Sequence, residues 1–443
     1  MDMNYCGIDR TQARNPAVDQ AKEAVRRAFR HYTGGIALRF WNSEMLELGR
    51  AAPRATVVFH SPGPFRDLIL HRDPLRLAEA YFSNLVDVEG DLYAVLSQRE
   101  HLGSLALSAF EKLSLLSMAL RLGNGSHTGR RGKLEIERPG RWLARFSRKH
   151  SRTADREAIA FHYDVSNDFY RLWLDEQMVY SCAYFENAED SLDRAQRNKL
   201  DHICRKLRLR PGERLLDIGC GWGALVRWAA KHYGVRALGV TLSRNQLEYA
   251  RQAIREQGLE DRVTVELQDY RDVGGNAVFD KIVSVGMFEH VGLKNLPLYF
   301  GIAHRLLRPG GLFLNHGITH DEEGWNKTLA TKFINRYVFP DGELDTVSNV
   351  QRVMERAQFE ILDVEALRPH YALTLRRWVE RLERRRDEAL QHVTESVVRI
   401  WRLYMAACAL HFENGDVGVY QILASQRGGR PAAVPLTRRD LYG

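Results

Sequence analysis

Cysteine is scarce in this sequence and long apolar runs are missing from it, and each shortage excludes a class of protein. The five cysteines are scattered and no two form a CxxC pair, so the sequence indicates neither a disulfide framework nor a zinc site. No run reaches the roughly 18 uncharged apolar residues that a membrane-spanning helix needs. The nearest candidate, Leu105–Leu122, has Glu111 and Lys112 in its middle, and residues 1–20 lack the apolar core of a secretory signal. We therefore expect a cytoplasmic protein.

The length and the net charge of the chain exclude fewer classes of protein. The 443 residues are 44% apolar, which predicts two or three domains with packed cores. Lys and Arg number 64 against 56 Asp and Glu, and the net charge of +8 suits an anionic partner such as nucleic acid or phospholipid headgroups. The sequence contains no internal repeat and no low-complexity tract.

Composition divides the chain into three regions. Residues 1–128 mix helical patterns with short β-like runs such as Ala55–Ser61, which predicts a small α+β domain. Residues 129–157 form a basic linker, in which the stretch Gly129–Arg156 has 10 Lys or Arg against 3 acidic residues. This linker is either a solvated connection or a surface that lies against anionic lipid. Residues 158–443 form the third region.

Strand-like and helix-like segments alternate in the third region, and this order predicts a doubly wound, mainly parallel sheet. The strands are expected at Arg214–Ile218, Arg236–Val240, Val263–Leu267, Lys281–Val285, Gly311–Asn315, Phe359–Val364 and Val419–Ala424. Two segments, Thr319–Gln358 and Leu367–Leu410, exceed ordinary connections and are expected to form helices that cover one end of the sheet.

The most informative stretch is LLDIGCGWG at residues 215–223, in which an apolar strand reaches an acidic residue and three glycines follow at spacing two. Glycine allows backbone conformations forbidden to other residues and lets a ligand press against the main chain. The spacing is GxGxG rather than GxGxxG, and Asp217 precedes the glycines, where its carboxylate can hold a cationic amino acid. A glycine-rich turn alone is a weak signal, because nucleotide-binding folds of many chemistries use one.

The segments that follow extend the pattern, which resembles motif I and its successors in S-adenosylmethionine-dependent methyltransferases. The second strand ends in GVTLS without the acidic residue that grips ribose in most NAD enzymes, and Thr241–Gln246 offers hydroxyls and amides instead. After the third strand, Asp269 and Tyr270 stand where an acid and a backbone amide could read the edge of an adenine.

Seven segments together resemble the cyclopropane-fatty-acyl-phospholipid synthases and the related mycolic acid methyltransferases. They are HYDVSNDFYRLWLDEQMVYSCAYF (162–185), LLDIGCGWG, GVTLS, QDYRD (268–272), VSVGMFEHVG (283–292), INRYVFPDG (334–342) and YMAACA (404–409). The match covers about residues 158–428, with a looser one in the N-terminal region. It implies a class I S-adenosylmethionine-dependent methyltransferase, with a Rossmann-like α/β sheet of seven strands and a helical lid, after a smaller α+β domain at residues 1–128 that is expected to engage lipid.

The resemblance also implies which residues form the site. In that family the methyl donor is bound by a tyrosine–serine pair, the glycine motif, the segment after the second strand and the acid after the third. Here these positions are Tyr180, Ser181, Leu215, Asp217, Gly219, Gly221, Gly223, Thr241, Leu242, Ser243, Gln246, Asp269 and Tyr270. The family's bicarbonate-holding active site is similar to Cys182, Glu289, His316, Tyr371 and the backbone of Ile318, and Cys408 matches a cysteine often labelled catalytic.

The chemistry of such an enzyme explains why these residue types gather. A cis alkene is a poor nucleophile, so methyl transfer needs the double bond held in line with the methyl group in a dry pocket. The transfer leaves a carbocation, and a base such as bicarbonate must remove a proton before the ring closes. Aromatic rings such as Tyr180, Tyr184 and Tyr337 are expected to stabilise that cation. Without the base, a methyl-branched product is the alternative.

Without the resemblance, several of these residues have plainer interpretations. Glu289 could cap a helix after the fourth strand, and His316 could be a satisfied core histidine. The two candidate cysteines could be ordinary buried cysteines, because the chemistry needs no thiolate. His316 and His320 have i, i+4 spacing but no evident acid or cysteine partner, so no metal site is expected.

The sequence thus predicts formation of cyclopropane fatty acids on phospholipid acyl chains. We expect peripheral contact with a phospholipid bilayer at the inner face of the cell membrane, and a homodimer. The bilayer would meet the basic linker or the arginine-rich helix Arg376–Arg386, whose alternative role is a lid packed on the core. No nucleic-acid partner is expected, because a [DNS]PP[YFW] motif and a proline-cysteine nucleophile are both missing. A lipid-binding protein with a degenerate enzyme domain would be expected to lose the GxGxG motif or the Glu289 and His316 set, and neither is lost.

Overall fold

The computed structural model describes residues 16–71, 74–98, 166–322, 343–428 and 434–442. The chain divides into two compact units, residues 1–137 and 138–443. The expected basic linker, the segment Leu105–Leu122 and the INRYVFPDG stretch with Tyr337 lie outside the described residues. None of the helices in the described ranges is both long and apolar enough to span a membrane.

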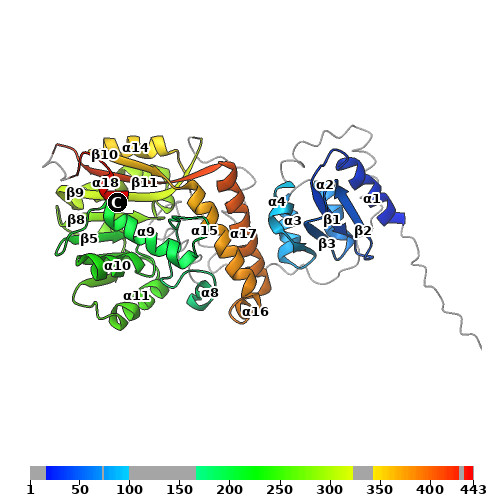
Figure 1. Ribbon diagram of the computed structural model, residues 1–443, viewed down its shortest axis with the longest axis horizontal. Coiled ribbons are helices and arrows are strands. Elements are labelled where there is room, and N and C mark those ends of the chain that lie inside the picture. Colours follow the sequence, from blue (N-terminus) through cyan, green and yellow to red (C-terminus); the bar gives the residue numbers. More distant parts are fainter. Residues whose placement is uncertain (1–15, 72–73, 99–165, 323–342, 429–433, 443) are drawn as a thin grey trace, which may run out of the picture. The chain divides into compact units, whose positions relative to one another are not determined.

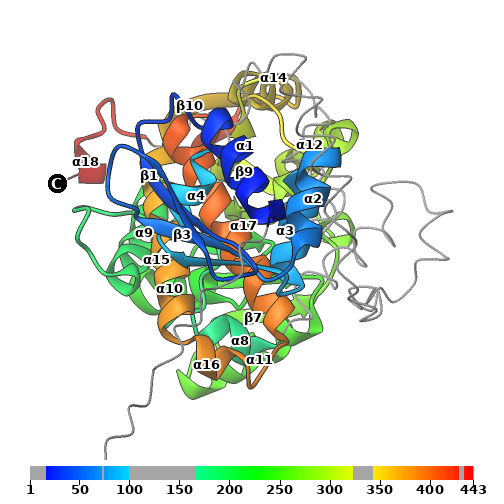
Figure 2. The same cartoon turned by 90° about the vertical axis from the view of Figure 1, so that its right-hand side faces the viewer.

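The N-terminal unit is a four-stranded sheet with three helices packed on one face. Its elements are α1 (Pro16–Ala28), β1 (Gly35–Arg39), β2 (Met45–Gly49), β3 (Ala55–Phe59), α2 (Pro62–His71), α3 (Pro74–Phe82), β4 (Val86–Gly90) and α4 (Leu92–Leu96). The strand order is β2-β1-β3-β4, in which the central pair is parallel and the outer pairs are antiparallel. Alternate strand residues, such as Ile36 and Leu38 in β1, share one core with α1, α2 and α3 (Figure 2). This is the α+β arrangement expected for the region.

The second unit is built on a seven-stranded sheet (Figure 1). Its strands are β5 (Arg214–Ile218), β6 (Arg236–Thr241), β7 (Val263–Leu267), β8 (Phe279–Val285), β9 (Leu307–His320), β10 (Phe359–Ala366) and β11 (Val417–Gln426). The order is β10-β11-β9-β8-β5-β6-β7, and β11 alone runs antiparallel to its neighbours. Each strand contains the range expected from the sequence, so the doubly wound, mainly parallel sheet is confirmed.

Helices cover both faces of this sheet, which is why its central strands read as nearly continuous apolar runs. One face carries α9 (Leu192–Lys206), α10 (Ala224–Tyr233) and α11 (Arg244–Glu256), and the other carries α12 (Leu296–Leu306) and α14 (Val347–Arg356). Successive residues of β5 show the alternation, because Leu215 packs in the first core and Leu216 in the second.

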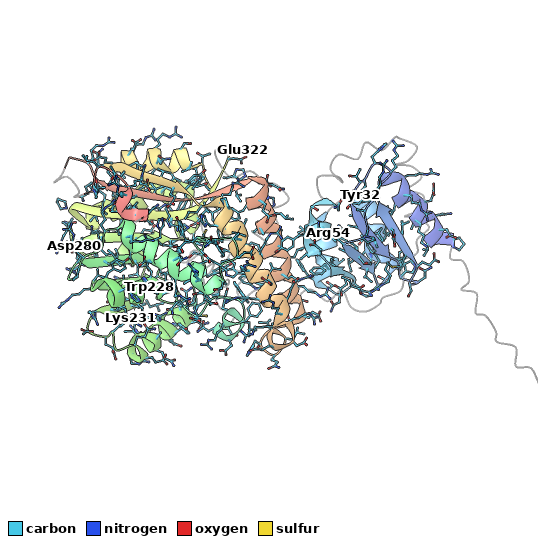
Figure 3. The ribbon with its side chains drawn as sticks, viewed as in Figure 1. Tyr32, Arg54, Trp228, Lys231, Asp280 and Glu322 are labelled. Atoms are coloured by element: carbon cyan, nitrogen blue, oxygen red, sulfur yellow. The ribbon has the colours of Figure 1, made fainter. Side chains whose placement is uncertain are left out.

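The strands start at an end of the sheet held by charged side chains. Asp280, at the start of β8, accepts hydrogen bonds from the backbone N–H of Arg214 and from the guanidinium of Arg308, both at 2.8 Å (Figure 3). These contacts join the first residues of β5 and β9 to β8. These contacts therefore lie at the end of the sheet that is opposite to the carboxyl ends of β5, β6 and β8.

Further helices follow the last parallel strand. They are α15 (Arg368–Arg384), α16 (Arg386–Ala389) and α17 (Glu395–Asn414), and α15 and α17 lie side by side (Figure 1). The helices expected within Leu367–Leu410 are thus confirmed. Shorter elements are α8 (Asn167–Arg171), η1 (Tyr270–Asp272), η2 (Phe288–His290), η3 (Leu293–Asn295) and α18 (Arg439–Tyr442).

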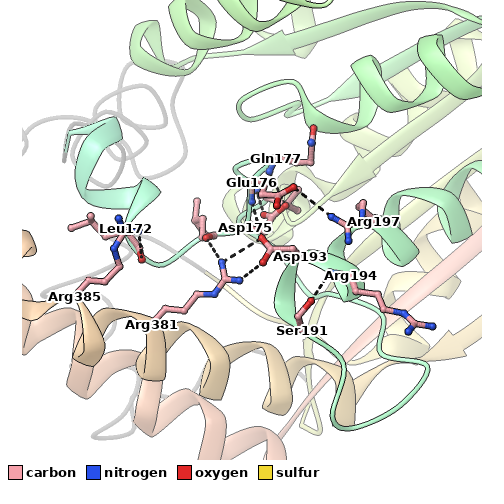
Figure 4. A network of polar contacts seen from close by, with 12 residues as sticks. Leu172, Asp175, Glu176, Gln177, Ser191, Asp193, Arg194, Arg197, Arg381 and Arg385 are labelled. Atoms are coloured by element: carbon pink, nitrogen blue, oxygen red, sulfur yellow. Dashed lines mark hydrogen bonds and ion pairs between the residues drawn. The ribbon is translucent and has the colours of Figure 1, made fainter.

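The arginine-rich helix α15 packs on the core through its apolar face. Leu375, Trp378, Val379 and Leu382 on that face are buried. Arg381 donates to the Leu174 carbonyl at 2.7 Å and pairs with Asp193, and Arg385 contacts the Leu172 carbonyl (Figure 4). Of the two alternatives for this helix, these contacts favour the lid packed on the core.

Strand β9 approaches η2 so closely that one position between them must lack a side chain. A Cβ atom on Gly317 would lie 1.9 Å from Cε1 of Phe288 and 3.1 Å from Oε1 of Glu289. The ring of Phe288 therefore occupies the place that a side chain at position 317 would need, and η2 packs directly against β9. Gly301, in the exposed middle of α12, has nothing within 4 Å of such an atom.

We expect Gly317→Ala to lower the free energy of unfolding by about 1–3 kcal/mol, because the added methyl group overpacks the contact with Phe288. Gly301→Ala adds the same group in open space within a helix and should raise stability by up to about 1 kcal/mol. Chemical denaturation of both variants measures the difference. Equal stability of the two would contradict the close approach of η2 and β9.

Candidate active site

The glycine turn after β5 has the backbone geometry that only glycine adopts readily. Gly219, Gly221 and Gly223 have φ values of +83°, +54° and +77°. The N–H groups of Gly219 and Cys220 both donate to the Val240 carbonyl of β6 at 3.0 Å. A Cβ on Gly219 would lie 2.7 Å from Cγ of Met287, whereas one on Gly221 would meet nothing within 4 Å. Position 219 is thus closed by a neighbour, and position 221 faces open space.

That open space is a pocket at the carboxyl ends of β5, β6 and β8, where ligands of open α/β sheets bind. We call it the strand-end pocket. Most of the residues that the sequence assigns to the methyl donor line it, namely Tyr180, Ser181, Asp217, Gly219, Gly221, Thr241, Leu242, Gln246 and Tyr270. The structure therefore brings together residues that are up to 90 positions apart in the chain.

The other four assigned residues do not line the strand-end pocket. Leu215 lies in the core, and Gly223 is the N-terminal cap of α10. The Ser243 hydroxyl accepts from the Gln246 N–H at 3.3 Å and begins α11. The Asp269 carboxylate accepts from the backbone N–H of Arg271 at 2.9 Å and from its guanidinium at 2.6 and 2.8 Å. These four residues thus act on the pocket only indirectly, through the core, the helix starts and the loop in which they lie. Gln268 and Arg271 line the pocket beside Tyr270.

Asp217 is the acidic group of the strand-end pocket. Its side chain is buried, and within the described part of the chain its Oδ1 has no hydrogen-bond partner. Burial raises the pKa of Asp217 to about 7, although the charge of Lys199 opposes this shift. A buried carboxyl with an unsatisfied oxygen at a pocket wall fits a cationic ligand, which is the role expected for it.

Lys199 is a pocket residue that the sequence analysis missed. It lies on α9, is buried, lines the strand-end pocket, and donates from Nζ to the Ser181 hydroxyl at 2.9 Å. The buried face of α9 also carries Gln196, His202 and Lys206, at helical spacing from Lys199. Polar residues repeating along an otherwise apolar helix face were the signal that could have found it.

Glu289 is held against β9 by a backbone hydrogen bond. Its Oε1 accepts from the N–H of Ile318 at 2.8 Å, while Oε2 is buried and has no partner among the described residues. Burial raises the pKa of Glu289 to about 7, and the Ile318 N–H opposes this shift. Glu289 and Ile318, both assigned to the reaction, are therefore in direct contact. Glu289 lies within η2 and not at its N-terminal cap, so the helix-cap interpretation is wrong.

His316 stands two residues earlier on β9 and is also buried. Its Nδ1 lies 3.3 Å from the amide Nε2 of Gln421 on β11, which donates to it, so the ring proton is placed on Nε2. That Nε2 atom has no partner among the described residues. Burial lowers the pKa of His316 well below its ordinary value, so the ring is neutral. A core histidine with both nitrogens satisfied is thus not what the structure describes.

Tyr371 lies on α15 and Cys408 on α17, and we call these two helices the lid helices. The Tyr371 ring on α15 packs on Phe412 of α17, with ring centroids 4.7 Å apart. The hydroxyl of Tyr404 is hydrogen-bonded to the Cys408 thiol and to Tyr180, which lines the strand-end pocket. Cys408 is therefore linked to the pocket through two tyrosines, and burial raises the pKa of its thiol.

Cys182 has the surroundings of an ordinary buried cysteine. The residue is 1% exposed, and its thiol donates to the Ala183 carbonyl at 3.3 Å. Burial raises the pKa of this thiol, despite the opposing charge of Lys199, so the thiolate is disfavoured. Neither candidate cysteine is therefore placed to act as a nucleophile.

Tyr184 does not offer a ring face to a cation, and the expectation that it does is wrong. Its ring is stacked between His202, with centroids 4.3 Å apart, and His370, with centroids 4.8 Å apart. Because both faces are covered, the ring joins α9 to α15 and is not available to a substrate. Tyr180 is the one of the three expected tyrosines that lines the pocket, and Tyr337 lies outside the described residues.

Comparison with known proteins gives these residues a context. The family model described as mycolic acid cyclopropane synthetase matches residues 150–422. A "Probable fatty acid methyltransferase" of Pseudomonas putida is 41% identical over 92% of this chain and 96% of its own length. The "Cyclopropane-fatty-acyl-phospholipid synthase" of Escherichia coli K12 is 42% identical over 60% of this chain and 66% of its own.

A solved structure agrees with the fold. The mycolic acid cyclopropane synthase CmaA1, complexed with SAH and CTAB, superposes with a TM-score of 0.58 and is 34% identical. The superposition covers 61% of this chain and 98% of that protein. The sequence-based expectation of a class I methyltransferase fold is thereby confirmed, and S-adenosylmethionine is the methyl donor that the strand-end pocket fits.

We expect Gly221→Val to weaken binding of S-adenosylhomocysteine by at least about 100-fold, because the new side chain enters the strand-end pocket. Gly258→Val is the matched control, since Gly258 has a similar φ of +62° and equally open surroundings but lies outside the pocket. Both variants should lose stability to a similar extent, of about 1 kcal/mol or more, from backbone strain. Calorimetry that found equal affinity in the two variants would contradict this position for the donor.

Proposed function

Because the chain belongs to the mycolic acid cyclopropane synthetase family and is an S-adenosylmethionine-dependent methyltransferase, we propose that it converts cis double bonds of phospholipid acyl chains to cyclopropane rings. The observation that carries the proposal concerns Glu289, which is bonded to β9, and His316, which lies on β9. Each presents a buried polar atom that no described residue satisfies. Phospholipid as the substrate is supported by the Escherichia coli relative, whose name states that it acts on fatty-acyl phospholipid.

The sheet and the lid serve the first step by positioning. The donor supplies an electrophilic methyl group on a sulfonium. Asp217 and the glycine turn would hold its amino-acid end, while Thr241, Gln246 and Tyr270 line the other part of the pocket. Since an alkene attacks weakly, the rate depends on alignment and on exclusion of water. The lining aromatic rings of Tyr180 and Trp222 suit both needs.

Glu289, His316 and Tyr371 would hold a bicarbonate that supplies the base for ring closure. The protonation states fit an anion. His316 is neutral with its proton on Nε2, and a Glu289 carboxyl whose pKa is raised to about 7 retains its proton on part of the molecules at neutral pH. Both groups can then donate a hydrogen bond, whereas an ionised Glu289 would repel the anion.

Methyl transfer without ring closure is the second candidate function. It is favoured by the Pseudomonas putida relative, which matches nearly the whole chain and is named as a probable fatty acid methyltransferase. In that case the carbocation would lose a proton from a neighbouring carbon or from the new methyl group, which leaves a methyl-branched or methylene chain that keeps an olefin, and no cyclopropane would form. The two functions give products of different structure and are separable by experiment.

The test is mass spectrometry of acyl chains after incubation with S-adenosylmethionine, bicarbonate and liposomes of cis-unsaturated phospholipid. We expect a gain of about 14 Da with resistance to ozonolysis, and a rate that falls when bicarbonate is removed. The same gain with an olefin retained would instead establish the second function. Free fatty acid as the preferred substrate would contradict the phospholipid assignment.

The role of Glu289 is tested in the same assay. We expect Glu289→Gln to lower ring formation by about 100-fold or more, since general acid–base groups contribute on that scale. Binding of S-adenosylhomocysteine should stay within threefold. Glu360→Gln, which changes an exposed carboxyl on β10, is the control and should leave the rate unchanged. Normal ring formation by Glu289→Gln would remove Glu289 from the mechanism.

A further inference from the structure

Lys199 is a buried cation that forms no ion pair with any residue in the described part of the chain. It is 2% exposed, and in the described part of the chain its ammonium makes one hydrogen bond, to the uncharged hydroxyl of Ser181 at 2.9 Å. An ammonium carries three N–H groups, so donors remain unused. Burying a charge without an ion-pair partner is costly, and such a group is retained where something else supplies the partner.

The acidic groups near Lys199 do not supply that partner. Asp175 is close enough for its charge to act on Lys199, but no ion pair joins the two among the described residues, and its carboxylate accepts the N–H groups of Val179 at 2.7 Å and Gln177 at 2.9 Å. Asp217 is close enough for its charge to be felt, but no ion pair joins it to Lys199 among the described residues. A cation and an anion thus stand in the lining of one pocket without neutralising each other.

This arrangement is complementary to an α-amino acid. The methionine end of S-adenosylmethionine is a zwitterion, with an ammonium and a carboxylate on the same carbon. Asp217 offers the oxygen that an ammonium requires, and Lys199 offers the N–H groups that a carboxylate requires. We propose that Lys199 binds the carboxylate of the methyl donor and so, together with Asp217, reads the amino-acid end of the donor.

The position of Lys199 on α9 explains how the contact would be coupled to the rest of the site. Ser181, its hydrogen-bond partner, lies between Tyr180 and Cys182 in the loop that lines the pocket. The Ser181 carbonyl accepts from the amide of Gln196, one turn earlier on α9, at 2.9 Å. The helix thus holds the loop through a backbone contact that does not involve Lys199. Removing the ammonium should therefore leave the loop in place.

The test compares two ligands that differ only in the group that Lys199 is proposed to bind. S-adenosylhomocysteine has the amino-acid end, and its decarboxylated analogue keeps the adenosine, the thioether and the amine. We expect Lys199→Met to weaken S-adenosylhomocysteine about 10- to 100-fold, the range of a charge-assisted hydrogen bond, and the decarboxylated analogue by less than threefold. Titration calorimetry measures all four affinities.

Lys231→Met is the matched control, since Lys231 is an exposed lysine on α10 (Figure 3). It removes the same charge and should change neither affinity. Equal weakening of both ligands by Lys199→Met would show a purely structural role and overturn the proposal, as would unchanged binding of S-adenosylhomocysteine.

The unmodified protein provides a second measurement, should Lys199→Met fail to fold. Burial lowers the pKa of Lys199 to about 8, so the ammonium loses its proton as the pH rises through that value. The preference of the unmodified protein for S-adenosylhomocysteine over the decarboxylated analogue should therefore fall between pH 7 and pH 9. A preference that is absent, or constant over that range, would contradict the assignment.

Discussion

Two carboxyl groups buried at the carboxyl ends of parallel strands impose the constraint on which this site depends. Asp217 is the second-last residue of the buried strand β5, and Glu289 follows β8, and each keeps one oxygen unsatisfied within the described part of the chain. A folded protein tolerates such groups poorly unless a ligand or a proton compensates them. Burial accordingly raises the pKa of both to about 7. The site is thus built around two buried carboxyl groups whose unsatisfied oxygens need a partner from a bound ligand.

The surrounding fold keeps both carboxyl groups buried, by a different local arrangement at each. Gly221 leaves open space in the pocket that Asp217 lines, and the missing side chain at Gly317 lets Glu289 reach the backbone of Ile318. The lid helices α15 and α17 carry Tyr371 and Tyr404, and the ion pair between Arg381 and Asp193 holds α15 to α9. The donor would occupy one half of the site and the reacting chain the other. Cyclopropane formation, as proposed, needs both halves.

Much of this architecture was predictable because the sheet is covered on both faces. Short, mainly apolar runs such as residues 214–218 predict buried strands, because both faces of the sheet are covered. The glycine spacing predicts the turn that follows. Lys199 was not predictable in the same way. A lysine beside an apolar helix stripe normally extends its ammonium to water, whereas here the ammonium is buried and donates to Ser181 in a loop that precedes the helix.

Tyr184 shows the same limit. Its sequence context of aromatic residues favoured a cation-stabilising ring, but His202 and His370 reach it from helices whose mutual position no local pattern encodes. The partners of the arginines on α15 were hidden for that reason too. Contacts within one element were therefore predictable from local patterns, whereas contacts between distant elements were predictable only where the family resemblance assigned the residues to one site.

The number of protons released when S-adenosylmethionine binds tests the central claim most directly. At pH 6.5 a buried Asp217 with a pKa near 7 holds its proton on most molecules, and binding of a cationic donor should ionise it. Calorimetry in two buffers of different ionisation enthalpy should detect release of roughly half a proton or more. Asp217→Asn should abolish that release. Binding that releases no proton, or that releases as much from Asp217→Asn, would contradict a site organised around uncompensated buried carboxyl groups.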